Sequence, residues 1–107
     1  MSSAGGQQVG EIGGGEDALV VAIALAGVLA ELGCCEITLT PREGGPRVMQ
    51  PRVTNLPREL ISASPCELEC VLPLGRPSIH VWFAGAIATW STSDAWAAKA
   101  LSRVALR

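Results

Sequence analysis

The sequence predicts an α+β fold, a two-layer sandwich of order α-β-β-β-β-α with both helices packed on one face of the sheet. Three observations predict it. Residues 16–32 are almost continuously apolar over the length of a helix, residues 36–83 hold short alternating segments separated by turn signals, and residues 94–106 have helical spacing. The chain has 107 residues, 49% of them hydrophobic and 17% charged. We therefore expect a single folded domain over residues 16–107.

Residues 1–15 form a leader with six glycines, which we expect to be flexible unless a partner orders it. Its Gly-rich end precedes a predicted helix, as a phosphate-binding loop does. No strand is predicted before it, its glycines lack the fixed spacing, and it contains no lysine. The carboxylates of Glu16 and Asp17 follow and would repel phosphate, so no nucleotide site is assigned.

The first helix is predicted over Glu16–Leu32, with Gly33 as its stop signal. Its expected core face is Leu19, Ala22, Ile23, Ala26, Leu29 and Ala30, but apolar residues also occupy most of the remaining surface. Such a helix must be covered on more than one side. It is either a central helix packed on a sheet and under a loop, or a helix shared with a second subunit or a partner. The uncharged apolar run, Ala18–Ala30, is too short to span a bilayer, and a cytoplasmic location is expected.

The first hairpin is predicted over residues 36–53, with the turn signal Glu43–Pro46 between two extended segments. Leu39 is expected opposite Met49. Pro51 has no N–H to donate to a neighbouring strand, so the returning strand should lie at a sheet edge. Residues 54–65 receive no assignment.

The second hairpin is predicted over residues 66–83, with Leu72 opposite Ile79. This pairing places on the core face Cys66, Leu68, Cys70, Ile79, Val81 and Phe83. It leaves outside Glu67, Glu69, His80 and Trp82. Slipping the register by one residue would set two carboxylates against the core, which is costly.

The last helix is predicted over roughly Asp94–Leu106, after a strong start signal at residues 91–94. Arg103 and Arg107 suit the negative end of the helix dipole. The predicted core stripe is Ala97, Leu101, Val104 and Ala105.

The four cysteines and one histidine give little support for metal or thiol chemistry. Cys66 and Cys70 would lie about 13 Å apart on a strand, too far to share a metal ion. Cys70 and His80 would point to opposite faces of the sheet, out of hydrogen-bond reach. No cation near Cys34–Cys35 would favour a thiolate. We therefore expect Cys66 and Cys70 to be buried and reduced, assign no redox state to Cys34 and Cys35, and expect no metal and no cofactor.

Motifs of known catalytic classes are missing from the sequence. It contains no G-x-S-x-G, no H-E-x-x-H and no Walker-type lysine. Glu67 and Glu69 are a pair of carboxylates, but on a solvated strand face where nothing would separate their pKa values. The chain is therefore predicted not to be an enzyme.

Charge is divided unevenly along the chain. Residues 1–40 hold five carboxylates and no Lys or Arg, whereas residues 41–107 hold all eight cations and five carboxylates. Four Pro-Arg dipeptides fall within segment 41–58, but their spacings make no continuous basic stripe and no aromatic residue lies among them. A nucleic-acid-binding module using this segment is the alternative hypothesis. A cysteine-dependent redox or metal protein is a third.

Our leading prediction is a small non-enzymatic protein-interaction protein, such as an inhibitor, adaptor or assembly subunit. Trp and Arg dominate interface hot spots, and the candidate contact residues are Arg42, Arg47, Arg52, Arg58, Arg76, Trp82, Trp96, Lys99 and Arg103. The helix over residues 16–32 is the candidate surface for homo-oligomers. One lysine among many Arg and Ala residues is typical of a GC-rich genome, and favours a phage or other mobile element of a GC-rich bacterium.

Overall fold

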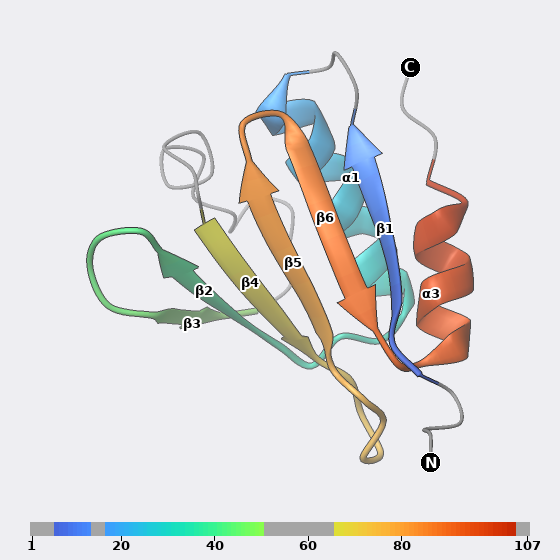
Figure 1. The fold of residues 1–107 in the computed structure, drawn as a ribbon. Coiled ribbons are helices and arrows are strands. Elements are labelled where there is room, and N and C mark those ends of the chain that lie inside the picture. The colour runs from blue at the N-terminus through green and yellow to red at the C-terminus, as the bar shows by residue number, and fades with distance from the viewer. Residues whose placement is uncertain (1–5, 14–16, 51–65, 105–107) are drawn as a thin grey trace.

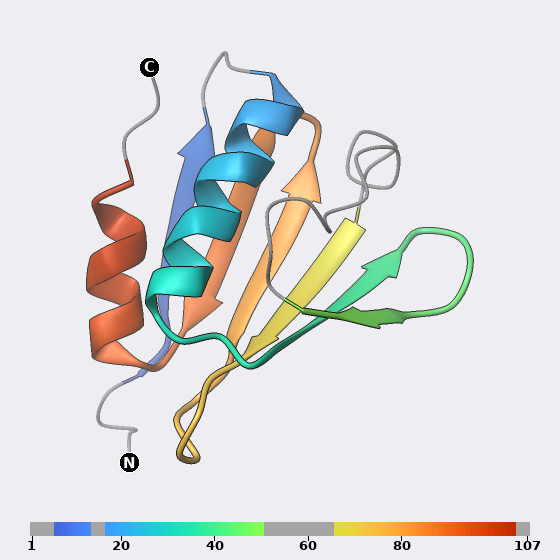
Figure 2. The ribbon, with the colours of Figure 1, turned by 180° about the vertical axis from the view of Figure 1, so that it is seen from behind.

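A computed structural model describes residues 6–13, 17–50 and 66–104, and contains one six-stranded antiparallel sheet with two helices on one face (Figures 1 and 2). The predicted α+β class and its two layers are confirmed. In chain order the elements are β1 (Gln8–Gly13), α1 (Ala18–Glu31), β2 (Glu36–Pro41), β3 (Arg47–Met49), β4 (Cys66–Val71), β5 (Ile79–Ala84), β6 (Ile87–Thr92) and α3 (Ala95–Ser102).

The sheet contains two strands, β1 and β6, that the sequence pattern does not predict. The strand order is β1-β6-β5-β4-β2-β3, so the first and sixth strands of the chain are neighbours. The prediction that residues 1–15 form a flexible leader is therefore wrong for Gln8–Gly13. These residues pair along the whole of β6, whose backbone groups would otherwise form an open edge.

β1 also changes the comparison with a phosphate-binding loop, because the strand includes residues 10–13 of the Gly-rich segment 10–15. Two arguments against phosphate remain. The segment has no lysine, and the Asp17 carboxylate already caps α1 by accepting a hydrogen bond from the Leu19 N–H at 3.1 Å. A carboxylate in this place repels an anion at the helix N-terminus.

The side of α1 that faces the sheet differs from the prediction. Val21 and Leu25, predicted to lie off the core face, are buried, whereas Ile23 is 44% exposed. The buried residues of the helix are Val21, Ala22, Leu25, Ala26, Val28 and Leu29. A helix that is apolar on nearly all sides carries too little amphipathic signal to indicate which side the sheet will cover.

Both predicted hairpins form, but each register is shifted by two residues. Met49 lies opposite Ile37 rather than Leu39, and Ile79 lies opposite Cys70 rather than Leu72. A shift of two keeps every side chain on its predicted face, so the side-chain pattern cannot distinguish the registers. β3 lies at the sheet edge, as predicted, while Pro51 is outside the described residues.

α3 is shorter than its predicted span and is followed by Arg103 as the C-cap. Its buried residues are Ala97, Ala98 and Leu101, and Val104 is partly buried. Ala105 and Arg107 lie outside the described residues. Neither α1 nor α3 has the length and apolar character needed to cross a membrane.

Candidate interaction surface

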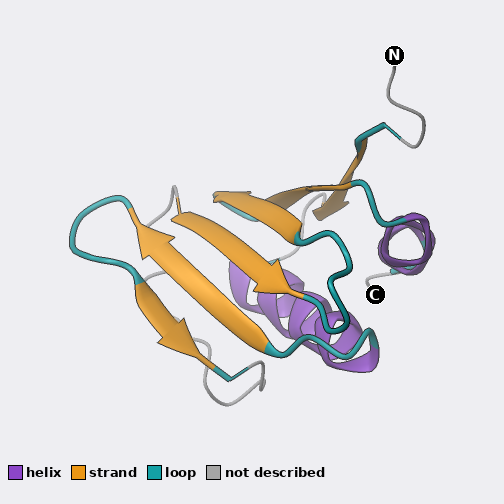
Figure 3. Ribbon diagram, turned by 90° about the horizontal axis from the view of Figure 1, so that it is seen from below, coloured by secondary structure: helices purple, strands orange, loops and turns teal. Residues whose placement is uncertain are grey.

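One face of the sheet is left open by both helices. Figure 3 shows the molecule from below, with the helices on one side of the sheet. Side chains alternate between the two faces along each strand. The open sheet face consists of Val9, Glu11, Glu36, Thr38, Thr40, Val48, Glu67, Glu69, Val71, His80, Trp82, Ala84, Ile87, Thr89 and Ser91.

The open sheet face is acidic. It carries four carboxylates, those of Glu11, Glu36, Glu67 and Glu69. Every Lys and Arg in the described part of the chain lies elsewhere. Arg42 is in the β2–β3 turn, Arg47 on the helix side of β3 and Arg76 in the β4–β5 loop. Lys99 lies on α3, and Arg103 is its C-cap. Fields of one sign on one face select partners of the opposite sign.

Trp82 lies near the middle of this face and is 47% exposed. The register places Glu67 of β4 directly across from it on one side and Thr89 of β6 on the other. Glu11 of β1 is opposite Thr89, two strands from Trp82 and about 10 Å away by strand spacing. A shallow groove of about 340 Å³ runs beside the indole, and the side chains of the open sheet face that line it are Val9, Glu67, His80, Trp82, Thr89 and Ser91.

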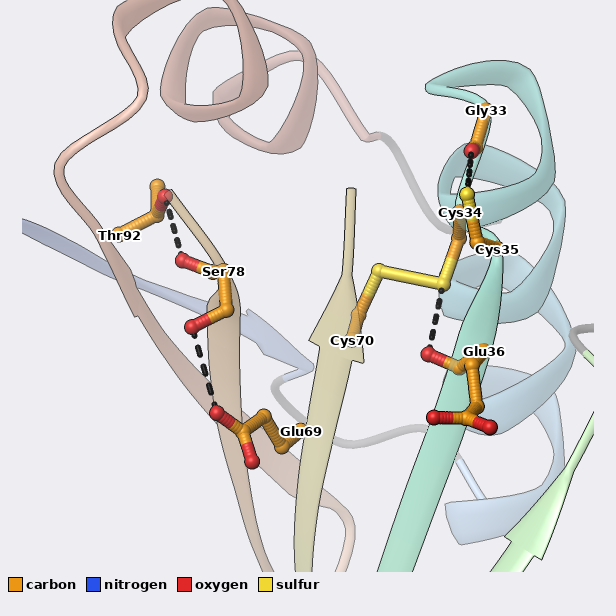
Figure 4. The surroundings of a disulfide bond; sticks show 8 residues. All are labelled: Gly33, Cys34, Cys35, Glu36, Glu69, Cys70, Ser78 and Thr92. Atoms are coloured by element: carbon orange, nitrogen blue, oxygen red, sulfur yellow. Dashed lines mark hydrogen bonds between the residues drawn. A yellow bond between two sulfur atoms is a disulfide. The ribbon is translucent and has the colours of Figure 1, made fainter. Parts of the chain in front are cut away.

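Of the two carboxylates on β4, only Glu69 is engaged. Its Oε2 accepts a hydrogen bond from the Ser78 Oγ at 3.3 Å (Figure 4) and lies 3.5 Å from the His80 Nε2. Glu67 forms no ion pair with any residue in the described ranges. With respect to the described residues, Glu67 is therefore an unpaired carboxylate directly opposite Trp82.

A cluster of Arg76, Asp94 and Trp96 lies at the N-terminus of α3. The Arg76 Nε donates to the Asp94 Oδ2 at 2.7 Å, while the Asp94 Oδ1 accepts from the Ala97 N–H at 2.9 Å and caps the helix. The Arg76 guanidinium carbon lies 4.9 Å from the ring centroid of Trp96. The hydrogen bond from Arg76 lowers the pKa of the buried Asp94 carboxyl, and the same bond raises the pKa of Arg76. Arg76 is thus held within the fold.

The candidate contact residues do not form one patch. Trp82 is on the open sheet face, Arg42 and Arg47 are exposed at the β2–β3 hairpin, and Arg52 and Arg58 lie outside the described residues. On the helix side lie Arg76, Trp96, Lys99 and Arg103. Arg76 and Trp96 meet each other but not Trp82.

Two residues near Trp82 were not among the sequence candidates. Glu67 could have been found, because the alternation of β4 places it outward. Glu11 gave no signal in the sequence, because only the pairing of β1 with β6 brings it to this face.

The expectation of a buried, reduced thiol is wrong for Cys70, which pairs with Cys34. A disulfide joins them across 36 residues of sequence, with Cα atoms 6.1 Å apart (Figure 4). Cys34 follows α1 and Cys70 lies on the core face of β4, so their pairing depends on tertiary contact that spacing does not reveal. Cys35 is a free, exposed thiol, and Cys66 is free and buried, with its pKa raised by burial and by Glu67.

The described residues contain no cluster of side chains that indicates a particular reaction. Within residues 6–13, 17–50 and 66–104, no group of three or more His, Cys, Asp or Glu residues could hold a metal ion. No family model, curated protein or solved structure matches the chain. The most distinctive surface of the described residues is therefore the open sheet face around Trp82.

Proposed function

We propose that this chain is a non-enzymatic interaction protein that binds a protein partner through the open sheet face. The exposed Trp82 beside a groove is the observation that supports this best. A Trp side chain buries a large apolar area with few rotatable bonds, and Trp dominates interface hot spots. An inhibitor, an adaptor or an assembly subunit would each use such a surface.

The size of the open sheet face suits a modest interface. Six strands spaced about 4.8 Å apart and about 20 Å long give a flat area on the order of 500 Å². A standard protein interface buries about 800 Å² on each partner. The partner either binds transiently or extends over a flank of the sheet, such as the β2–β3 hairpin.

Self-association through α1 is a second element of the proposal. Val20 and Ile23 are exposed apolar residues on the outer side of this helix. A neighbouring groove between α1 and α3 is lined by small residues such as Ala24, Gly27 and Ala100. These features favour contact with a second copy of the chain.

A nucleic-acid-binding role for segment 41–58 has less support than protein binding. Arg42 and Arg47 are exposed at one end of the sheet, but the four carboxylates of the open sheet face would repel phosphates. The disulfide also bears on location. Because the cytosol keeps thiols reduced, the Cys34–Cys70 pair favours an oxidising compartment over the cytoplasmic location that the sequence predicts.

The test uses the purified full chain as bait and a matched pair of variants. Trp82→Ala removes the tryptophan of the open sheet face, whereas Trp96→Ala removes an exposed tryptophan on the helix side. Proteins captured from host extract are quantified by mass spectrometry. Partners lost with Trp82→Ala and retained with Trp96→Ala support the proposal. Equal capture by Trp82→Ala and the wild type would reject it.

A further inference from the structure

From the charge and contacts of the open sheet face we infer the chemistry of its partner, an inference that rests on the proposed function. The partner presents a basic segment, and one of its Lys or Arg side chains occupies the groove between the Trp82 ring and the Glu67 carboxylate.

The first argument for this inference is the geometry of two neighbouring side chains. Trp82 and Glu67 are directly opposite each other on β5 and β4. The Cβ atoms of such a pair lie about 5 Å apart, so one cation can contact both side chains. A guanidinium or ammonium group binds the face of a Trp ring within about 6 Å of its centroid, and a carboxylate strengthens this contact by pairing with the same charge.

The second argument is that Glu67 has no ion-pair partner among the described residues. Glu69, two residues away on the same face, is already engaged by Ser78 and His80. Glu67 lines the groove together with Trp82 and forms no ion pair within the described ranges. Among the described residues none competes for this carboxylate, which can accept hydrogen bonds from a partner's cation.

The same combination of groups is found elsewhere in the chain with its cation in place. Arg76 lies over the Trp96 ring at 4.9 Å while its Nε is bonded to the Asp94 carboxylate at 2.7 Å. Trp82 and Glu67 repeat the aromatic ring and the carboxylate of that cluster, but no Lys or Arg of the described residues joins them. A partner's Lys or Arg would complete the set.

The third argument is the negative charge of the whole open sheet face. Glu11 and Glu36 extend the negative field on both sides of the groove, and no described Lys or Arg opposes it. A neutral or acidic segment would leave these carboxylates uncompensated, whereas a basic segment is attracted over a distance and positioned in register.

The experiment titrates the full chain, labelled with ¹⁵N, with a short extended peptide that alternates Arg and Ser. A matched peptide carries citrulline, a neutral isostere of Arg, at the same positions. The three indole N–H signals are followed separately. We expect the Arg peptide to shift the Trp82 signal and to leave the Trp96 signal unchanged, and the citrulline peptide to shift neither.

Variants separate a specific pocket from general attraction. Glu67→Gln should weaken binding of the Arg peptide about two- to fivefold, the size of effect expected when an exposed ion pair next to a cation–π contact is lost. Glu36→Gln, on the same face but away from the groove, should have a smaller effect. Trp82→Leu keeps apolar area without the aromatic ring and should weaken binding at least as much as Glu67→Gln. Raising the salt from about 0.1 M to about 1 M shortens the Debye length from about 10 Å to about 3 Å and should weaken binding further.

Equal binding of both peptides at Trp82 would overturn the inference while leaving the open sheet face an interaction surface. The same holds if Glu67→Gln and Glu36→Gln have equal effects. Failure of the Arg peptide to shift Trp82 at millimolar concentration also rejects the inference. The proposed function fails separately, in the capture experiment, if the loss of Trp82 changes no partner.

Discussion

The indole ring of Trp90 on β6 lies over Gly10, its cross-strand partner on β1. A Cβ built on Gly10 would be only 2.4 Å from the Trp90 Cζ2 and 2.6 Å from its Cε2, closer than any side chain tolerates. Trp90 is only 3% exposed and belongs to the core. The absence of a side chain at Gly10 therefore allows the indole of Trp90 to pack directly against β1.

Gly10→Ala should destabilise the protein by about 1 to 3 kcal/mol, because the added methyl group must displace the Trp90 ring or separate β1 from β6. Denaturant unfolding measures the loss, and tryptophan fluorescence reports the movement of the ring.

Gly27→Ala is the matched control, since a Cβ at Gly27 would meet no atom within 4 Å. It lies within α1, where replacing Gly by Ala should stabilise by about 0.5 to 1 kcal/mol. If Gly10→Ala destabilised the protein no more than Gly27→Ala does, the packing of Trp90 over Gly10 would be disproved.

Removal of the disulfide with Cys34→Ala and Cys70→Ala should cost about 3 to 4 kcal/mol in unfolding free energy. The bond closes a loop of 36 residues, and restricting that loop in the unfolded chain is the main source of its stabilisation. Cys35→Ser, at an exposed free thiol, should change stability by less than about 0.5 kcal/mol. Thiol titration of the denatured, non-reduced protein should find only Cys35 and Cys66; four reactive thiols would contradict the disulfide.

Substitutions of Asp94 separate its two roles. Asp94→Ala removes both the cap of α3 and the acceptor of Arg76, and should destabilise by about 2 kcal/mol or more. Asp94→Asn retains a good capping side chain but loses the charge, so it should cost less than Asp94→Ala. Thermal unfolding at neutral pH compares the two variants; an equal loss would show that the cap contributes little.

The Arg76–Asp94 pair also predicts the sign of a pH effect. The folded-state pKa of Asp94 is lowered, first by the hydrogen bond from Arg76. Its stabilising contribution is therefore present above the pKa of an unfolded aspartate, about 3.9, and is lost as the pH falls through the lower, folded value. The difference in unfolding free energy between wild type and Asp94→Asn should shrink on going from pH 7 into this acid range. A difference that stayed constant with pH would refute the role of the charge.

Self-association through α1 predicts that light scattering finds an oligomer of the wild-type chain. Ile23→Glu places a charge on the exposed apolar side of the helix and should shift the oligomer to monomer without unfolding it. Val48→Glu, at an exposed apolar position on β3, is the control and should leave the mass unchanged. A monomeric wild type at high concentration would rule out this part of the proposal.

Several features follow from the sequence alone because they depend on local chemistry. The predicted helix start at residues 91–94 is where the Asp94 carboxylate caps α3, by accepting a hydrogen bond from the Ala97 N–H. The alternation of β4 and β5 places Trp82 and Glu67 outward in any register that keeps the core buried. The α+β class follows from the same patterns, since a period of two and an apolar helical run do not depend on which strands become neighbours.

Only the tertiary structure decided which distant segments meet. Residues far apart in the chain meet where β1 pairs with β6 and where the disulfide links Cys34 to Cys70. The side of α1 that is buried likewise depends on contacts with distant segments. Local pattern does not distinguish registers that differ by two residues, nor one side of a uniformly apolar helix from another. Glu11 therefore reaches the surface around Trp82 only because the chain folds its first strand against its last.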